Sequence, residues 1–297
     1  MGSESLLDWH DVVREYAGFV ALFLMAGAIG FRWVVVRGSP AAGADELRVR
    51  ARALARAAMY GLIGAAGAAV LLALALPGMA ERQHATIPEM LAHSRPVMVQ
   101  VMLAVLALIG FALATARVGA GWPLATLGWL LGMVRAAFFG QWSRLVNPLH
   151  EVGAGLWIGT LFVLVAVGLP TVLRSELASE RRGTVAAGMI HAFSPFALGS
   201  AALLSVFGVI TAVRHLKRLV ALWTTPYGWT FIAKLAVVAL VAGLGAYHWR
   251  RVRPRLGTES AALQLQHSGW REVVAAAVVL ALTAVLVSLP SPKFPAP

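Results

Sequence analysis

Long apolar runs, separated by short polar connections, occupy most of the chain. A membrane-spanning helix needs roughly 20 mostly apolar residues, because each residue advances an α-helix by only about 1.5 Å. Eight segments reach that length: residues 12–36, 53–77, 97–115, 121–140, 149–172, 194–213, 228–248 and 270–289. The pattern therefore predicts an all-α fold, a polytopic membrane helical bundle of about eight transmembrane helices.

The connections are too short to hold a soluble domain, so we expect residues 1–297 to form a single integral membrane domain. The composition agrees, since 59% of the residues are hydrophobic and 13% are charged, whereas soluble domains are about 25% charged. The start of the chain lacks the basic region and cleavage site of a secretory signal peptide, so we expect the first helix to remain as an anchor.

The formal charge of +12 is distributed unevenly along the chain. Arginines gather in the connections at 37–56, 173–192 and 249–269, whereas the connection at 78–96 holds only Arg82 and Arg95. Loops rich in Lys and Arg stay in the cytoplasm, so we expect both termini to lie outside and the lipid bilayer, not nucleic acid, to be the partner. The basic connection after residue 213 does not fit this topology.

Small and charged residues inside the apolar runs suggest how two helices pack. Glycine pairs lie on the fourth and fifth segments: Gly128 with Gly132, and Gly155 with Gly159. Small residues let membrane helices approach closely, so we expect these two faces to meet. Arg135 and Glu151 would then lie at one level, and we predict a structural ion pair between them, because an unpaired membrane arginine is costly. Lys234 is a further membrane charge, at a depth similar to that of Glu15.

The residue types that remain for chemistry are histidine and methionine. The chain has no cysteine, which excludes thiolate metal sites, and no GxxxxGK[ST] loop for a nucleotide. Nothing in the pattern predicts an enzyme, catalytic residues or a cofactor site. Imidazole suits late transition metals and thioether selects Cu(I), so this set favours copper. The candidate metal ligands are His150, His93, Met98, Met102 and His84 on the outer side, and His248 and His191 on the inner side.

His150 is the most informative of these candidates. It stands beside Glu151, but helical geometry turns it about 100° away from that carboxylate, to a face with no obvious charge partner. We therefore expect an outer copper site centred on His150 and completed by His93, Met98 and Met102. This site requires the third and fifth helices to be neighbours. The alternative is structural, since interfacial histidines and packed methionines are common in membrane helices.

Residues 222–256, LWTTPYGWTFIAKLAVVALVAGLGAYHWRRVRPRL, resemble the signature of the copper resistance D (CopD) family of bacterial inner-membrane proteins. The shared features are a tyrosine-glycine turn, an early lysine at Lys234 and an arginine-rich exit. The resemblance is strongest over residues 140–290 and departs from the family at Gln141, where a histidine is common. Other matching motif positions are His150, Trp157, Gly159, Phe193, Ser194 and Glu272.

The resemblance implies a role in copper homeostasis or resistance, with copper transported or imported across the bacterial inner (plasma) membrane. It also implies a partner, a periplasmic CopC-type copper-binding protein. In an inner membrane, the arginine distribution described above puts both termini in the periplasm. Two other classes stay open: a b-type haem membrane protein or respiratory oxidase assembly factor, and a purely structural subunit. Haem needs axial ligands that face each other inside the bundle, whereas these histidines gather near its mouths.

Overall fold

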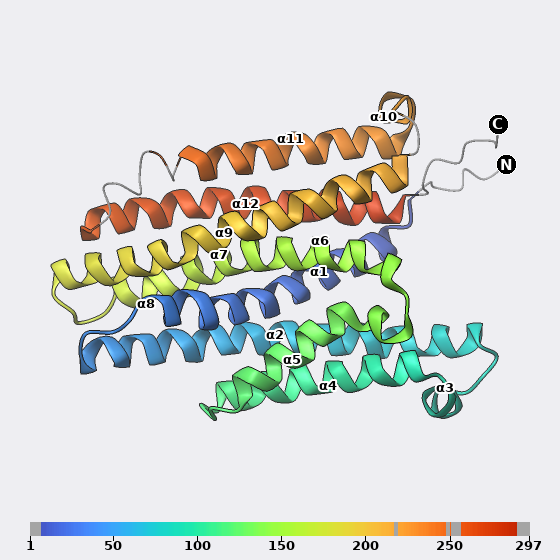
Figure 1. Cartoon of the computed structure of the whole chain (residues 1–297), viewed down its shortest axis with the longest axis horizontal. Helices are drawn as coiled ribbons and strands as arrows, with labels where there is room; N and C mark the ends of the chain where they lie inside the picture. The colour runs from blue at the N-terminus through green and yellow to red at the C-terminus, as the bar shows by residue number, and fades with distance from the viewer. Residues whose placement is uncertain (1–6, 217–218, 248–249, 251–256, 290–297) are drawn as a thin grey trace.

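The computed structural model describes residues 7–216, 219–247, 250 and 257–289, and this part of the chain consists of helices joined by short connections (Figure 1). Eight of its helices are long and apolar enough to cross a membrane, which confirms the predicted all-α polytopic bundle. They are Trp9–Val36, Ala44–Arg82, Arg95–Thr115, Gly121–Phe139, Trp142–Leu173, Ser179–Leu216, Pro226–Ala246 and Glu259–Ser288.

Several spans are built from more than one helical segment. The first combines α1 (Trp9–Gly30) with the π-helical η1 (Phe31–Val36), and the fourth combines α5 (Gly121–Val134) with the 3-10 turn η2 (Arg135–Phe139). The fifth comprises η3 (Trp142–Leu145), α6 (Val146–Ala154), η4 (Gly155–Gly159), α7 (Thr160–Val163), η5 (Leu164–Gly168) and α8 (Leu169–Leu173). The other helices are α2 (Ala44–Arg82), α3 (Ile87–His93), α4 (Arg95–Thr115), α9 (Ser179–Leu216), α10 (Ala221–Thr224), α11 (Pro226–Tyr247) and α12 (Glu259–Ser288).

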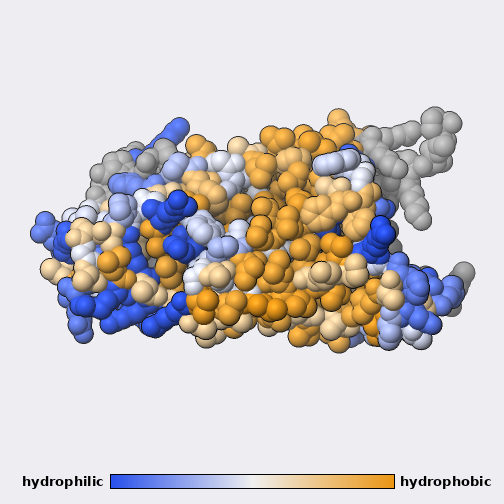
Figure 2. Space-filling view, turned by 60° about the horizontal axis from the view of Figure 1, so that its bottom comes forward, coloured by the Kyte–Doolittle hydropathy of each residue, from blue (hydrophilic) through white to orange (hydrophobic). Residues whose placement is uncertain are grey.

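Three helices extend well beyond the apolar runs that predicted them. α2, α9 and α12 begin at Ala44, Ser179 and Glu259, whereas the apolar segments begin near residues 53, 194 and 270. Their first turns are polar, because helical hydrogen bonding continues outside the hydrocarbon layer, where polar side chains meet water or pair with one another. Figure 2 shows the result, with hydrophobic residues over the middle of the bundle and hydrophilic residues gathered at both ends.

The two ends of the bundle differ in charge. The end where α1 begins and α12 ends is called the terminal end here, and the end where α2, α9 and α12 begin is called the basic end (Figure 1).

Between the two ends, α1 packs against α2, the fifth span and α12, while α4 and α5 form a hairpin beside α2. α6 packs against α9, and α11 packs against α12 at the edge of the bundle and buries few side chains.

The fifth span crosses α1 at backbone contact. A Cβ atom added at Gly27 would lie 2.2 Å from the carbonyl oxygen of Gly159, and one added at Gly159 would lie 2.3 Å from the carbonyl oxygen of Phe23. Both distances are shorter than any real contact of a Cβ atom, so the crossing requires glycine on both helices. Gly155 lies in the same seam, where its missing Cβ leaves room for Ala26 and Leu22.

The predicted pairing of the two glycine faces is therefore wrong. Gly128 packs against Ala107 of α4, whose backbone nitrogen would lie 2.4 Å from an added Cβ, and Gly132 has no atom within 4 Å. The physical reason is that small residues specify a close approach without specifying the partner. The face of α5 that carries Gly128 is covered by its hairpin partner α4, and Gly159 meets α1 instead.

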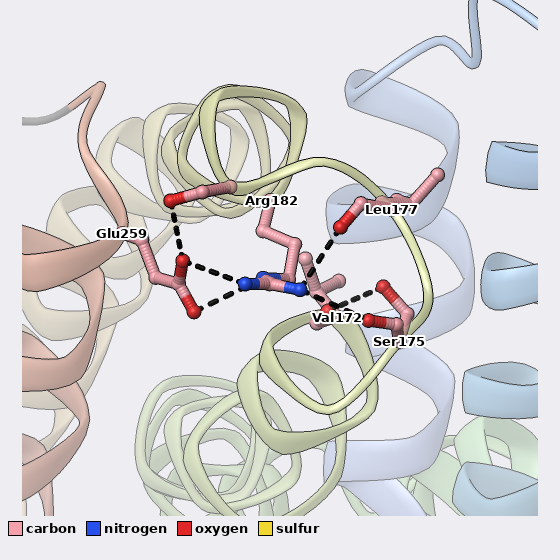
Figure 3. A network of polar contacts seen from close by, with 6 residues as sticks. Val172, Ser175, Leu177, Arg182 and Glu259 are labelled. Carbon is pink, nitrogen blue, oxygen red and sulfur yellow. Dashed lines mark hydrogen bonds and ion pairs between the residues drawn. The ribbon is translucent and has the colours of Figure 1, made fainter.

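A hydrogen-bonded brace joins three segments at the basic end (Figure 3). The guanidinium group of Arg182 donates from Nε and Nη2 to the two carboxylate oxygens of Glu259, at 3.0 and 2.8 Å. Its Nη1 donates to the carbonyl oxygens of Ser175 and Leu177, and Ser179 donates to Glu259. The brace links the end of α8 to the starts of α9 and α12, because a planar guanidinium matches a carboxylate in a bidentate pair.

Candidate functional site within the membrane

Ionisable side chains gather inside the bundle, in the half nearer the terminal end. They come from four segments: Glu15 on α1, Arg135 on η2, His150 and Glu151 on α6, and Lys234 on α11. Glu151 interacts electrostatically with Glu15, Arg135 and Lys234, and His150 interacts with Lys234. None of the five is an exposed residue. The cluster sets two carboxylates against two cations, as expected where charges cannot be left alone in lipid.

Arg135 and Glu151 belong to this cluster but do not form the predicted ion pair. No direct ion pair joins them among the described residues, and Arg135 instead donates from Nη1 to the carbonyl oxygen of Gly132 at 2.9 Å. The chain tightens into a 3-10 turn at Arg135, and the Gly132 face does not meet the fifth span. The two charges therefore interact at longer range, and Lys234 supplies the second cation.

His150 lies where α6 crosses α9. Its Nδ1 is 2.9 Å from the carbonyl oxygen of Leu204, and its ring packs on Gly208, where an added Cβ would lie 2.9 Å from Cε1. A carbonyl oxygen only accepts, so Nδ1 must carry the hydrogen, and in the neutral ring Nε2 keeps its lone pair. Metal-binding histidines commonly have this arrangement, in which the other ring nitrogen donates to a carbonyl.

The seam between α6 and α9 contains further polar contacts that the sequence did not reveal. Asn147 accepts from the hydroxyl of Thr211 at 3.1 Å, and Arg214 donates to the carbonyl oxygen of Ser143 at 2.7 Å. Arg214 belongs to the basic connection that did not fit the predicted topology. Its contact with Ser143 gives it a structural role at the terminal end. Gly153 permits the close approach, since an added Cβ would lie 2.8 Å from the backbone nitrogen of Leu204.

The other ligands expected for the outer copper site are not gathered around His150. Met98 and Met102 are 40% and 60% exposed on α4, which packs chiefly against α2 and α5. His93 is exposed on α3, with Nδ1 2.8 Å from the carbonyl oxygen of Glu89, and His84 is exposed in the preceding turn. The third and fifth spans are not neighbours, so the expected four-residue set is not assembled. Within the described residues, no three His, Asp or Glu side chains gather as a metal site.

At the basic end, His191 is exposed and lines a polar cavity between α2 and α9. His248, the other histidine expected at this mouth, lies outside the described residues. The structure therefore places one of the two inner candidates, and it shares its cavity with Arg50 and Arg181, a setting that does not favour a bound cation.

Two methionines that sequence reasoning did not select lie close to the ionisable cluster. Met25 of α1 and Met133 of α5 both line a cavity of about 210 Å³, together with Arg135. Met25 also lies on the α1 face that carries Glu15, because positions 15, 18, 22 and 25 follow a helical spacing of three and four. Only knowledge of which helices are neighbours could have revealed this pair, since each methionine alone looks like packing.

Four of the motif positions converge on one larger cavity. A space of about 530 Å³ lies between the fifth span and α9, α11 and α12, mostly apolar, with Arg250 among its polar residues. Its walls include Trp157 from the fifth span, Phe193 and Ser194 from α9, and Glu272 from α12. These residues are far apart in the sequence, so their convergence indicates a common role for the motif in shaping the interior of the bundle.

Comparison with known proteins supports the resemblance noted from the sequence. Residues 187–286 match the family model described as "Copper resistance protein D", which confirms the resemblance to the CopD family over this region. The region holds most of α9, all of α11 and most of α12. The matched region therefore contributes Lys234 to the ionisable cluster and Leu204 as the hydrogen-bond partner of His150. It also contributes three of the motif residues that line the larger cavity.

The chain is also similar to a protein described as copper transport protein CutJ of Bacillus subtilis. The two are 29% identical over 154 residues, which is 52% of this chain and 26% of that relative's length. The match thus spans about a quarter of the relative. No solved structure matches the chain.

Proposed function

We propose, from the premise that residues 187–286 belong to the CopD family, that the protein transports copper across the bacterial inner membrane. The observation that supports this most directly is that the matched region forms, with the fifth span, the walls of an intramembrane polar cluster and cavity. Ionisable residues within membrane helices commonly mark ion pathways. The role is transport in copper homeostasis or resistance, with import as the direction, and it requires no catalytic step.

Copper would bind soft and borderline donor atoms as it crosses the bundle. The thioethers of Met25 and Met133 and the Nε2 atom of His150 are the donors inside the bundle, and thioether and imidazole suit Cu(I). The carboxylates of Glu15 and Glu151 would lower the cost of placing the copper ion beside Arg135 and Lys234. Four exposed side chains would collect copper at the terminal surface, where a periplasmic CopC-type protein would deliver it. They are those of His84, His93, Met98 and Met102. We place the whole chain, residues 1–297, in one membrane domain.

The proposal is tested by copper accumulation in cells and in vesicles that contain the purified protein. We expect His150→Ala to lower the rate of copper accumulation about tenfold, because it removes an imidazole ligand. His150→Gln is expected to lower it as well, although glutamine can still donate to Leu204. The matched control is His267→Ala, since His267 is exposed on α12 and its Nδ1 lies 3.0 Å from the carbonyl oxygen of Leu263 in its own helix.

Equal copper accumulation by His150→Ala, His150→Gln and the unmodified protein, at equal membrane abundance, would refute the role of His150. The visible absorption spectrum of the purified protein separates transport from the haem alternative, because bound haem absorbs strongly in the visible range. We expect no haem bands and copper in the metal analysis.

The proposed orientation puts the terminal end in the periplasm and the basic end in the cytoplasm. The chain has no cysteine, so single cysteines can be introduced without a background. We expect Asp45→Cys, at the exposed start of α2, to resist a membrane-impermeant thiol reagent in intact cells, and Gln83→Cys, exposed beyond the other end of α2, to react. The opposite labelling pattern would show that the orientation is reversed.

A further inference from the structure

A polar cavity at the basic end is separate from the proposed copper path. Its volume is about 410 Å³, and it lies between the first turns of α2, the first half of α9 and the linker before α2. Charged residues from two helices line it: Glu46 and Arg50 from α2, and Arg181 from α9. His191 completes the wall on α9.

The carboxylate in this cavity is already fully engaged. Glu46 is 5% exposed, and its Oε1 lies 2.8 Å from Nη2 of Arg181. Its Oε2 accepts the backbone N–H of Ala42, also at 2.8 Å. Glu46 therefore pairs with Arg181, holds the linker and also interacts electrostatically with Arg50, so one carboxylate serves two guanidinium groups.

The second arginine is deeply buried and incompletely paired. Arg50 is 6% exposed, and its Nη2 donates to the carbonyl oxygen of Pro40 at 2.8 Å. Its buried Nε has no hydrogen-bond partner among the described residues. Arg50 and Arg181 together carry two positive charges against the single negative charge of Glu46. A buried guanidinium group that lacks full compensation is costly, and its preferred partner is an oxyanion that can accept two hydrogen bonds.

We propose that this cavity binds a phosphate group, held by Arg50 and Arg181 with His191 as an additional donor. A metal cation would face two guanidinium groups, so His191 acts here as part of an anion site. The phosphate has two sources within reach, the headgroup of an anionic lipid in the adjacent leaflet or a soluble phosphate. Basic pockets at the membrane surface bind lipid headgroups by the same chemistry. This site is independent of the copper role.

The test uses the purified full-length protein with two probes. Inorganic phosphate is titrated into the protein in detergent and followed by thermal unfolding, since a ligand that binds only the folded state raises its stability. Retained lipid is measured by native mass spectrometry after incorporation into bilayer discs of phosphatidylglycerol or of phosphatidylcholine. We expect saturable stabilisation by phosphate, or selective retention of phosphatidylglycerol. The first result identifies a soluble ligand and the second a lipid.

Substitutions of the cavity residues show whether the phosphate or the lipid binds in this cavity. Arg50→Gln and Arg181→Gln are each expected to weaken binding about tenfold, the loss of one charge-assisted contact. Arg52→Gln, which removes an exposed arginine from the same turn region of α2, is the control and leaves binding unchanged. If Arg50→Gln does not fold, Arg50→Lys keeps the charge without the planar fork and is expected to weaken binding. Equal binding by both arginine variants and the unmodified protein, or no binding of either probe, would overturn the proposal.

Discussion

Gly27→Ala should destabilise the protein by at least about 3 kcal/mol, near the upper range for overpacking a buried site. The added Cβ would lie 2.2 Å from the carbonyl oxygen of Gly159 and 2.5 Å from its carbonyl carbon. These are backbone atoms, so no side-chain rotation relieves the clash and the two helices must separate. Since α1 packs against α2, the fifth span and α12, separation disturbs much of the bundle. Unfolding in detergent and membrane abundance measure the effect.

The matched control is Gly18→Ala, on the same helix. An added Cβ at Gly18 meets no atom within 4 Å, and alanine favours the helix over glycine by about 1 kcal/mol. We therefore expect Gly18→Ala to be neutral or stabilising. Equal stability of the Gly27→Ala and Gly18→Ala variants would show that α1 and the fifth span are not in backbone contact.

Glu151→Gln and Lys234→Met should each lower copper transport by at least tenfold, because each removes one charge from a cluster that is balanced inside the membrane. Glu151 and Lys234 interact electrostatically across α6 and α11. The stability of the double variant distinguishes a coupled pair from two separate effects. We expect its loss of stability to be smaller than the sum of the single losses by about 0.5–3 kcal/mol, the usual coupling between interacting residues.

Measuring copper transport by the double variant distinguishes a loss of protein stability from a loss of transport activity. We expect it to regain membrane abundance but not copper transport, because the carboxylate that offsets the charge of the ion is still missing. Glu81→Gln serves as the control, since Glu81 is exposed at the terminal end of α2. Additive losses in the double variant would show that Glu151 and Lys234 are not coupled, whatever the transport rate.

The positions of the eight spans could be predicted because the bilayer imposes one length and one polarity on every helix that crosses it. The helix ends could not, since hydropathy detects only the part in lipid. α9 begins at Ser179, before its apolar run, and its first turns carry Arg181 and Arg182, which pair with Glu46 and Glu259. A capping signal was available for α12, where the side chain of Thr258 accepts from the backbone N–H of Ala261.

The charged residues of the candidate site could be recognised in the sequence, but their contacts could not. Lys234 and Glu151 were recognisable as membrane charges, yet their interaction depends on α11 lying within range of α6, which no local pattern encodes. His150 stood out in the sequence, but its hydrogen bond to Leu204 arises from a helix crossing 54 residues away in the chain. The pairing of Met25 with Met133 in one cavity depends on helix packing in the same way.

The position of α11 at the edge of the bundle has a consequence for how the protein is made. α11 buries few side chains, and in addition to its packing on α12 the charge of Lys234 interacts with Glu151 in the interior. Glu15 and Glu151 precede Lys234 in the chain, so during synthesis both acidic helices emerge from the ribosome first. The lysine thus enters a bilayer that already holds its counter-charges, which reduces the roughly 3 kcal/mol penalty of inserting a charged residue. A chain with the reverse order would have to insert this helix without them.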